Sequence, residues 1–421
     1  MRNRLIFTLS IVLAAHFASC NQKIGETKVE KLAKVLENNL YNNIIPFWEN
    51  HTIDEVNGGF YGIVDATGKG NPEAPKGAIL NTRILWAFSA IHLKDKDKGS
   101  LKMAKRAYDY LTLNFIDTQY GGVYYTLDKS GKAIDESKNV YANSFAIYGL
   151  SEYYRATGNE RALEQAISIF ELIDNFAHDE IYGGYGENYK RDWLPIEPEG
   201  RHVSDKSMNT SLHVMEAFAN LYRVWKSPLL EKRLEEMIVI FLDKIINPET
   251  QRQHYEFSRY WVSQSDIESY GHDIECSWLL LEAAEILGNE QLLERVRTTS
   301  IAMAEASLKA LDENGRMLYE TKNGEPAKSL QWWTQAEAIV GFINAWQLTR
   351  DEIWLDRAWS VWNYTEQHFV DKKYGEWYWG FNEEGVLNKE LPKVTEWKAP
   401  YHNSRMCLEI IRRSQQSNPE K

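Results

Sequence analysis

The chain has 421 residues, of which 48 are Lys or Arg and 60 are Asp or Glu, so its formal net charge is −12. An acidic chain without long basic runs is a poor candidate for nucleic-acid binding, and we expect no nucleic-acid partner. The 11 prolines and the 13% share of aromatic residues exclude a disordered or collagen-like chain, and 15 tryptophans are typical of a cleft for a ligand with flat apolar faces.

The N-terminus has the pattern of a bacterial lipoprotein export signal. Arg2 and Arg4 precede an apolar stretch, residues 5–15, that is too short to span a bilayer. Two small residues then stand directly before Cys20. We therefore expect residues 1–19 to be a signal peptide and Cys20 to be lipidated. The protein would be a periplasmic or outer-membrane-associated lipoprotein that meets the membrane only through this anchor; cleavage without lipid attachment is the alternative.

One turn signature recurs along the rest of the chain. Its first copy reads Gly58-Gly59-Phe60-Tyr61-Gly62, and the position of its second glycine returns at residues 122, 184, 253, 316 and 376. The spacings are 63, 62, 69, 63 and 60 residues. Each copy favours a short aromatic strand and a tight turn, because Gly tolerates the positive φ that such turns need. Six near-equal units predict a repeat architecture.

Two helical stretches separate successive turn signatures. The clearest pair is 142–157 and 160–177, joined by a Gly-Asn pair that ends one helix and begins the next. One further helix, about 28–48, precedes the first signature, and another, about 401–413, follows the sixth. Twelve helices in six pairs predict an all-α fold, a closed (α/α)6 barrel with short β-hairpins between helix pairs. We expect residues 20–421 to form it as a single domain. An open solenoid is the alternative, but neither end carries the polar capping repeat that a solenoid requires.

In such a barrel the inner helix of each pair is the one that follows a hairpin, and its first turn lies at the mouth of the barrel. We expect the active-site residues on these first turns. Three of the ten histidines occupy this position in three different repeats: His213, His272 and His402. The other candidates near this position are Arg83, Asn143, Asn209, Glu216, Glu275, Trp332, Trp333, Glu337 and Trp397. This convergence predicts an active site at one end of the barrel.

Two of the histidines are spaced to pair with carboxylates. Glu216 follows His213 by three residues, and Glu275 follows His272 by three, so each pair lies on one helix face. A neighbouring carboxylate orients an imidazole and raises its pKa, and two facing histidines suit general acid–base catalysis near neutral pH. Histidine and glutamate clusters also bind metal ions. The sequence has no HExxH motif and no helical metal-ligand spacing, so we expect no metal.

Several longer motifs resemble the cellobiose 2-epimerases, a branch of the N-acylglucosamine 2-epimerase superfamily. They are Pro46–Trp48, Asn57–Gly62, Ala74–Trp86, Met208–Ala217, Gly271–Glu275, Gln331–Ala338 and Glu396–His402. The resemblance covers nearly the whole chain after the signal and implies the same (α/α)6 barrel. It also implies epimerisation at C2 of the reducing-end glucose or mannose of a β-1,4-linked disaccharide, such as cellobiose or mannobiose. The export signal is a departure, because many family members are cytoplasmic.

The resemblance further implies roles for the candidate residues. After ring opening, His272 and His402 match the two groups that remove and return the C2 proton through a cis-enediolate. His213 matches the histidine that assists ring opening, and Arg83 matches the group that stabilises the enediolate oxygens. The remaining candidates would orient the histidines, bind hydroxyls or pack on the sugar faces. No redox cofactor or metal is implied, and we expect a monomer or weak dimer.

Other functions remain open at this point. An N-acylglucosamine or mannose 2-epimerase or isomerase would use similar residues. A glycoside hydrolase on the same barrel needs two opposed carboxylates. The available glutamates lie next to histidines, which disfavours this function. A surface lipoprotein that only binds glycans would explain the tryptophans and Cys20, but not three histidines at matching repeat positions.

Overall fold

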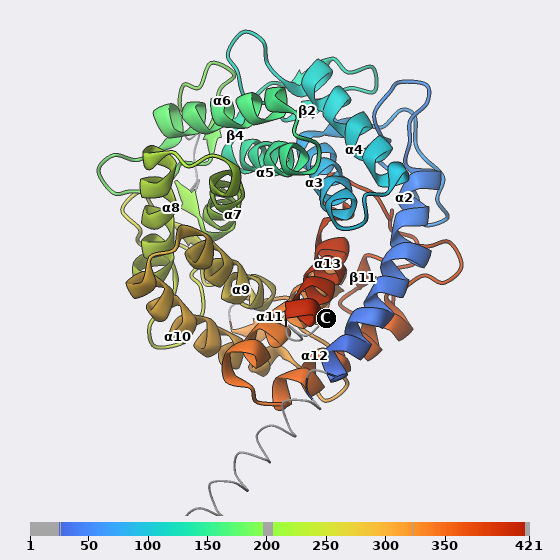
Figure 1. Cartoon of the computed structure of the whole chain (residues 1–421), viewed down its shortest axis with the longest axis vertical. Helices are drawn as coiled ribbons and strands as arrows, with labels where there is room; N and C mark the ends of the chain where they lie inside the picture. The colour runs from blue at the N-terminus through green and yellow to red at the C-terminus, as the bar shows by residue number, and fades with distance from the viewer. Residues whose placement is uncertain (1–24, 26, 197–204, 323, 417–421) are drawn as a thin grey trace, which may run out of the picture.

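Two concentric rings of helices form the molecule (Figure 1). The computed structural model describes residues 25, 27–196, 205–322 and 324–416, so the expected signal peptide and Cys20 lie outside the described residues. The inner ring consists of α3 (Ala78–Asp95), α5 (Val140–Thr157), α7 (Met208–Val224), α9 (Tyr270–Leu287), α11 (Trp332–Thr349) and α13 (Tyr401–Gln416). The predicted (α/α)6 barrel is confirmed.

The outer ring contributes the second helix of each pair. It consists of residues 27–39 continued by the π-helical η1 (Leu40–Ile44) and α2 (Ile45–His51), then α4 (Lys98–Tyr110) with η2 (Leu111–Phe115), α6 (Glu160–Ala177), α8 (Pro228–Ile240) with η3 (Phe241–Ile245), α10 (Glu290–Ser307) with η4 (Leu308–Ala310), and α12 (Ile353–His368). Among the described residues, none of these helices combines the length and apolarity that crossing a bilayer needs.

Sequence sorts the helices between the two rings. The inner helices α3, α9 and α11 carry buried residues on every face, whereas outer helices such as α6 bury one stripe and expose the rest. A helix that is apolar all round is stable only inside a core, and an amphipathic one covers it. The α5–α6 junction shows how one helix ends and the next begins. Gly158 has a φ of 71°, which favours Gly, and the Asn159 side chain accepts the backbone N–H of Ala162.

Short strands join each repeat to the next at one end of the barrel. The described residues form six antiparallel pairings of two- or three-residue strands, grouped in five small sheets. They are β1 (Lys76–Gly77) with β2 (Thr126–Leu127), which also pairs β3 (Ala133–Asp135), β4 (Lys138–Asn139) with β5 (Asn188–Tyr189), β6 (Lys206–Ser207) with β7 (Glu256–Phe257), β8 (Thr321–Lys322) with β9 (Glu325–Pro326), and β10 (Leu330–Gln331) with β11 (Gly380–Phe381). Four of the six pairings connect one repeat to its neighbour, and the other two, β2 with β3 and β8 with β9, each lie inside one repeat.

The first and sixth repeats close the ring. An antiparallel bridge joins Val64 to Val394, and Nη1 of Arg83 donates to the Trp397 carbonyl at 2.9 Å. Helices α3 and α13 also pack side by side (Figure 1). The open solenoid is therefore excluded, and all six inner helices begin at the hairpin end of one closed ring.

A buried lysine holds the turn signature in four of the repeats. The Nζ atom of Lys76 lies 2.8 Å from Asp54, and that of Lys138 lies 2.9 Å from Asp117. The two other pairs are Lys206 with Asp179 and Lys393 with Asp371. In three of the four pairs the same ammonium also donates to the carbonyl of a signature glycine. Each aspartate also accepts backbone N–H groups of its turn, so the ion pair fixes the loop that leads into the inner helix.

Candidate active site

The first turns of the inner helices surround a cavity of about 190 Å³ at the hairpin end of the barrel. Nine of the twelve sequence-predicted site residues line it: Arg83, Asn209, His213, His272, Glu275, Trp332, Trp333, Trp397 and His402. They come from α3, α7, α9, α11 and α13 and from the loop before α13. The fold thus brings together residues that are as much as 319 positions apart, as for Arg83 and His402.

Four polar atoms on the cavity wall have no hydrogen-bond partner among the residues that the structure describes. They are two donors, Nε of Arg83 and Nε1 of Trp332, and two acceptors, Oδ1 of Asn209 and Oε2 of Glu275. Buried polar groups are nearly always paired, so unpaired ones in a cavity mark the places that a ligand satisfies. A sugar hydroxyl both donates and accepts, and it therefore suits a wall with both kinds of group.

Each of the three histidines on the cavity wall is held through its Nδ1 atom by a different partner. The Nδ1 atom of His213 lies 2.9 Å from Oε2 of Glu216, as the spacing predicts. The His272 ring instead meets Oγ of Ser269 at 2.6 Å, and Glu275 does not hold it. The prediction that Glu275 orients His272 is therefore wrong, because Glu275 is bound by an arginine described below.

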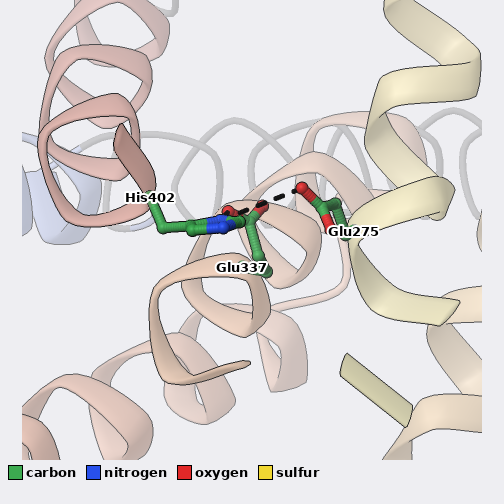
Figure 2. A group of neighbouring side chains, drawn as sticks. All are labelled: Glu275, Glu337 and His402. Carbon is green, nitrogen blue, oxygen red and sulfur yellow. Dashed lines mark hydrogen bonds and ion pairs between the residues drawn. The ribbon is translucent and has the colours of Figure 1, made fainter. Parts of the chain in front are cut away.

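His402 takes its partner from another helix. Its Nδ1 lies 2.7 Å from Oε1 of Glu337 on α11 and 3.9 Å from Oε1 of Glu275 on α9. Figure 2 shows the three side chains converging from three helices. Because a carboxylate accepts hydrogen bonds, Nδ1 of His402 carries the ring proton, and Nε2 is left as the basic nitrogen of the neutral ring.

Arg405 is the centre of the charge network beneath the cavity. Its Nη2 lies 2.5 Å from Oε1 of Glu275 and 2.7 Å from Oε1 of Glu337, and its Nη1 binds Glu216. The side chain is 2% exposed. His402, Glu275 and Glu337 come close enough to hold a metal ion. The guanidinium of Arg405 already supplies a cation bound to both carboxylates, and hard metal ions and an arginine compete for the same oxygens.

Burial sets the protonation of two histidines on the cavity wall. Burial lowers the pKa of His272 to about 3, and it lowers the pKa of His402 well below its usual value, with the positive charges of Arg83 and Arg405 adding to the effect. The sequence-based expectation of a raised pKa is therefore wrong for His272. Removal from water disfavours the charged imidazolium more than the nearby carboxylates favour it. Both rings are neutral near pH 7 in the ligand-free site.

The carboxylates respond to the same network in opposite directions. Burial raises the pKa of Glu275 to about 7, helped by the negative charge of Glu337. For Glu216, burial acts in the same direction, but the charge of Arg405 and the contact with His213 outweigh it and lower the pKa to about 2. Glu275 can therefore hold a proton near pH 7 while Glu216 stays ionised and keeps its ion pair with Arg405.

The other three predicted residues lie outside the cavity wall. Glu216 and Glu337 sit beneath it, each between a histidine and Arg405. Asn143 is fully buried in the wall of the fold, where its side chain accepts the backbone N–H of Val123 and donates to the Asn139 carbonyl. The expected direct sugar contact of Asn143 thus gives way to a structural one, since both ends of its amide are already paired.

Sequence reasoning missed several residues of the site. Arg405 follows His402 by three positions, which is the same-face spacing that signalled the histidine–glutamate pairs, so this signal was present. The cavity wall further includes Tyr141, Tyr255, Tyr319, Gln331 and Trp379. The Tyr141 hydroxyl accepts a hydrogen bond from Nη2 of Arg83 at 2.7 Å. The centroid of the Trp333 ring lies 4.7 Å from that of His272 and 5.4 Å from that of His402.

A closed α/α barrel with neutral histidines, aromatic rings and unpaired polar atoms in one mouth defines a carbohydrate-active class of protein. The chain belongs to the N-acylglucosamine 2-epimerase (GlcNAc 2-epimerase) family, whose sequence profile matches residues 58–403.

Individual relatives agree with this membership. The chain is 39% identical over 388 residues to a cellobiose 2-epimerase of Bacteroides fragilis, covering 91% of this chain and 99% of the relative. It is 38% identical over 379 residues to a cellobiose 2-epimerase of Ruminococcus albus, covering 89% and 97%. The solved structure of cellobiose 2-epimerase from Bacillus thermoamylovorans superimposes with a TM-score of 0.87 at 37% identity, covering 91% of this chain and all of that one.

Proposed function

We propose that the protein epimerises the reducing-end sugar of β-1,4-linked disaccharides at C2, converting cellobiose to glucosyl-mannose and mannobiose to mannosyl-glucose. The observation that carries the proposal is the pair His272 and His402, two neutral, buried histidines on one cavity wall, each held at Nδ1 by a separate partner. Names of the relatives at 38–39% identity support the disaccharide as substrate.

The proposed reaction begins with opening of the reducing ring to the aldehyde, assisted by His213. One of the two histidines, through Nε2, then takes the C2 proton, and the electron pair of the C2–H bond moves to give the C1=C2 enediolate. Its oxygen charge is stabilised by Arg83, whose Nε has no hydrogen-bond partner within the described part of the chain. The other histidine returns a proton to the opposite face of C2, forming the new C2–H bond.

The returning proton comes from solvent in this scheme. Both histidines are neutral before the reaction, so the proton donor has to acquire its proton when the enediolate forms, because the negative charge raises the pKa of an adjacent imidazole. The histidine that took the C2 proton releases it to solvent, so both rings are neutral again after ring closure and either one can act as the base in the reverse direction. Solvent deuterium should therefore enter C2 during turnover.

The decisive experiment is cellobiose with the purified protein, followed by NMR of the product in D₂O. An isomer of equal mass with deuterium at C2 is the expected result. Release of monosaccharide would identify a hydrolase instead, and no change in the sugar would identify a binding protein. Because positioned acid–base groups contribute about 100- to 10,000-fold each, His272→Ala and His402→Ala should each lose at least about 100-fold in kcat.

The matched control is His368→Ala, which removes an exposed histidine from the outer helix α12 and should leave the rate unchanged. If both cavity variants fold, as judged by circular dichroism, and still epimerise cellobiose within a few-fold of the wild type, the proposed roles are wrong.

We further propose that the protein is exported and lipid-anchored at Cys20 after removal of residues 1–19. The basic residues, the short apolar stretch and the small residues before Cys20 support this proposal. Mass spectrometry of the native N-terminus tests it. A diacylated Cys20 is the expected result, and an unmodified N-terminus at another residue would overturn it.

A further inference from the structure

A second cavity, of about 540 Å³, lies at the opposite end of the barrel from the active site. The C-terminal halves of α3, α5, α7, α9 and α13 line it, whereas the first turns of the inner helices line the active site. Its volume falls within the range of about 300–1,000 Å³ that small-molecule sites occupy. The proposed epimerisation makes no use of it.

A single layer of side chains separates the two cavities. Glu216 and Arg405 both line the second cavity. On the side of the active site, Glu216 binds His213, and Arg405 binds Glu337, the partner of His402. The Tyr401 hydroxyl donates to Glu216 and completes the layer. Each cavity therefore has its own entrance, and we name the second one the far-end cavity.

Three arginine–glutamate pairs line the far-end cavity. Nη1 of Arg155 lies 2.6 Å from Glu152, Nη2 of Arg223 lies 2.7 Å from Glu282, and Nη2 of Arg412 lies 2.6 Å from Glu409. Each pair cancels its own charge, and the charge of Arg405 is already taken up by three carboxylates. Lys94, the fifth cation on the wall, pairs with Glu37 and Asp95, so each cation on the wall already has a carboxylate partner and none is left free for an anion such as phosphate. The wall is rich in donors and acceptors and favours a neutral, polar ligand.

Aromatic rings form the inner part of the wall. Trp86 and Tyr148 stack with ring centroids 5.1 Å apart and an interplanar angle of 8°, and Trp278 lies 4.7 Å from the Arg405 guanidinium. Neither the Tyr148 hydroxyl nor the Trp86 indole N–H has a hydrogen-bond partner among the described residues. Sugars combine apolar ring faces, which pack on aromatic rings, with hydroxyls that bind paired charges and free donors.

We infer that the far-end cavity is a second carbohydrate site, one that binds a neutral sugar of mono- to disaccharide size without turning it over. The reason is the combination of a stacked aromatic wall, two unpartnered donors and three self-neutralised ion pairs in one cavity. Among the residues that line it there is no histidine, so the cavity offers no acid–base pair for the proposed chemistry. This inference does not depend on the proposed epimerisation.

Methyl β-cellobioside is the probe, because its methylated reducing end cannot open and so cannot react. Titration calorimetry of the wild type should give two sites per chain. Tyr148→Phe removes only the unpartnered hydroxyl and should weaken one site by about two- to tenfold, the range of a single hydrogen bond. Tyr153→Phe is the matched control on the same helix; Tyr153 does not line the cavity, and both sites should be unchanged.

A second variant blocks the cavity outright. Ala219 lines the far-end cavity on α7, and Ala219→Trp should fill it, abolish one binding site and leave the KM for cellobiose turnover unchanged. Binding of the cellobioside that is unchanged in both Tyr148→Phe and Ala219→Trp, whether at one site or two, would overturn the inference. Binding of ATP or inorganic phosphate that Ala219→Trp abolishes would also overturn it, by showing an anion site. Turnover is measured separately, so failure of this inference and failure of the proposed function are distinguishable.

Discussion

Arg405 offers the sharpest test of how the site is held together, through the substitution Arg405→Met. The guanidinium is 2% exposed and binds Glu216, Glu275 and Glu337, so its removal leaves three buried carboxylates without their shared cation. Breaking a buried ion pair from one side costs about 3–5 kcal/mol. We expect the free energy of unfolding at pH 7 to fall by that amount.

The pH dependence of this loss has a definite sign. Without Arg405, burial and mutual repulsion raise the carboxylate pKa values in the folded variant, while those of the unfolded chain stay near 4.3. Between pH 7 and 5 the folded variant then binds a proton that its unfolded state does not, so lowering the pH stabilises it. The folded wild type already binds one proton over this range, because the pKa of Glu275 is about 7, whereas the pKa of Glu216 is about 2. The deficit relative to the wild type should therefore shrink by about 1.4 kcal/mol per pH unit for each further proton that the variant binds, as on Glu216.

Urea denaturation followed by circular dichroism at pH 5, 6 and 7 measures both quantities. Arg412→Met is the matched control, because Arg412 lies on the same helix, is half exposed, and pairs only with Glu409 among the described carboxylates; a loss below about 1 kcal/mol is expected there. A loss of less than about 1 kcal/mol in Arg405→Met at pH 7, or a deficit that grows as the pH falls, would refute the reasoning, since the buried-pair cost cited above is about 3–5 kcal/mol.

Three further predictions concern the histidines and the turn lysines. Ser269→Ala removes the partner of His272 and should lower kcat by about tenfold while KM is kept, since the lost hydrogen bond is worth about 1 kcal/mol and orients the ring; an effect confined to KM would contradict this. The pKa of His272 is about 3 in the folded protein and about 6.5 in the unfolded chain, so its stabilising contribution is present above pH 6.5 and is lost as the pH falls. Between pH 6 and 4 the free energy of unfolding of the wild type should therefore fall about 1.4 kcal/mol per pH unit more steeply than that of His272→Asn, and parallel slopes would count against a neutral His272. Lys76→Met should lower the free energy of unfolding, measured by chemical denaturation, by about 3–5 kcal/mol, because it leaves the buried Asp54 carboxylate without its cation. Lys138→Met should lower it less, because Arg191 still binds Asp117 at 2.9 Å. Equal losses in the two variants would show that Arg191 does not compensate.

Periodic features of the chain predicted the fold well. Six copies of the turn signature at near-equal spacings indicate that each repeat has the same shape, and a ring of equal units brings equivalent positions together at one end. This is why His213, His272 and His402 could be assigned to one site although two of them are separated by 189 residues. Repetition served here as a long-range constraint that single-helix patterns do not supply.

Contacts between helices could not be predicted in the same way. Arg405 binds carboxylates 68, 130 and 189 residues away, and no local spacing encodes those distances. The spacing of His272 and Glu275 predicts a shared face, but Glu275 is drawn to the charged guanidinium of Arg405 in preference to a neutral imidazole. Asn143 shows the converse error, since its position in the repeat is equivalent to the site residues while its amide completes the turn below it.

Closure of the ring has a consequence for how activity arises during synthesis. The cavity needs Arg83 from the first repeat and His402 from the sixth, and the bridge from Val64 to Val394 forms only when nearly the whole chain is available. Contacts of such long sequence separation form late and slowly. A growing or truncated chain that lacks α13 therefore lacks His402, the proposed proton-transfer partner of His272, and Arg405, the cation that binds three glutamates. On the proposed mechanism, fragments of the barrel that lack α13 should therefore be inactive however well they fold.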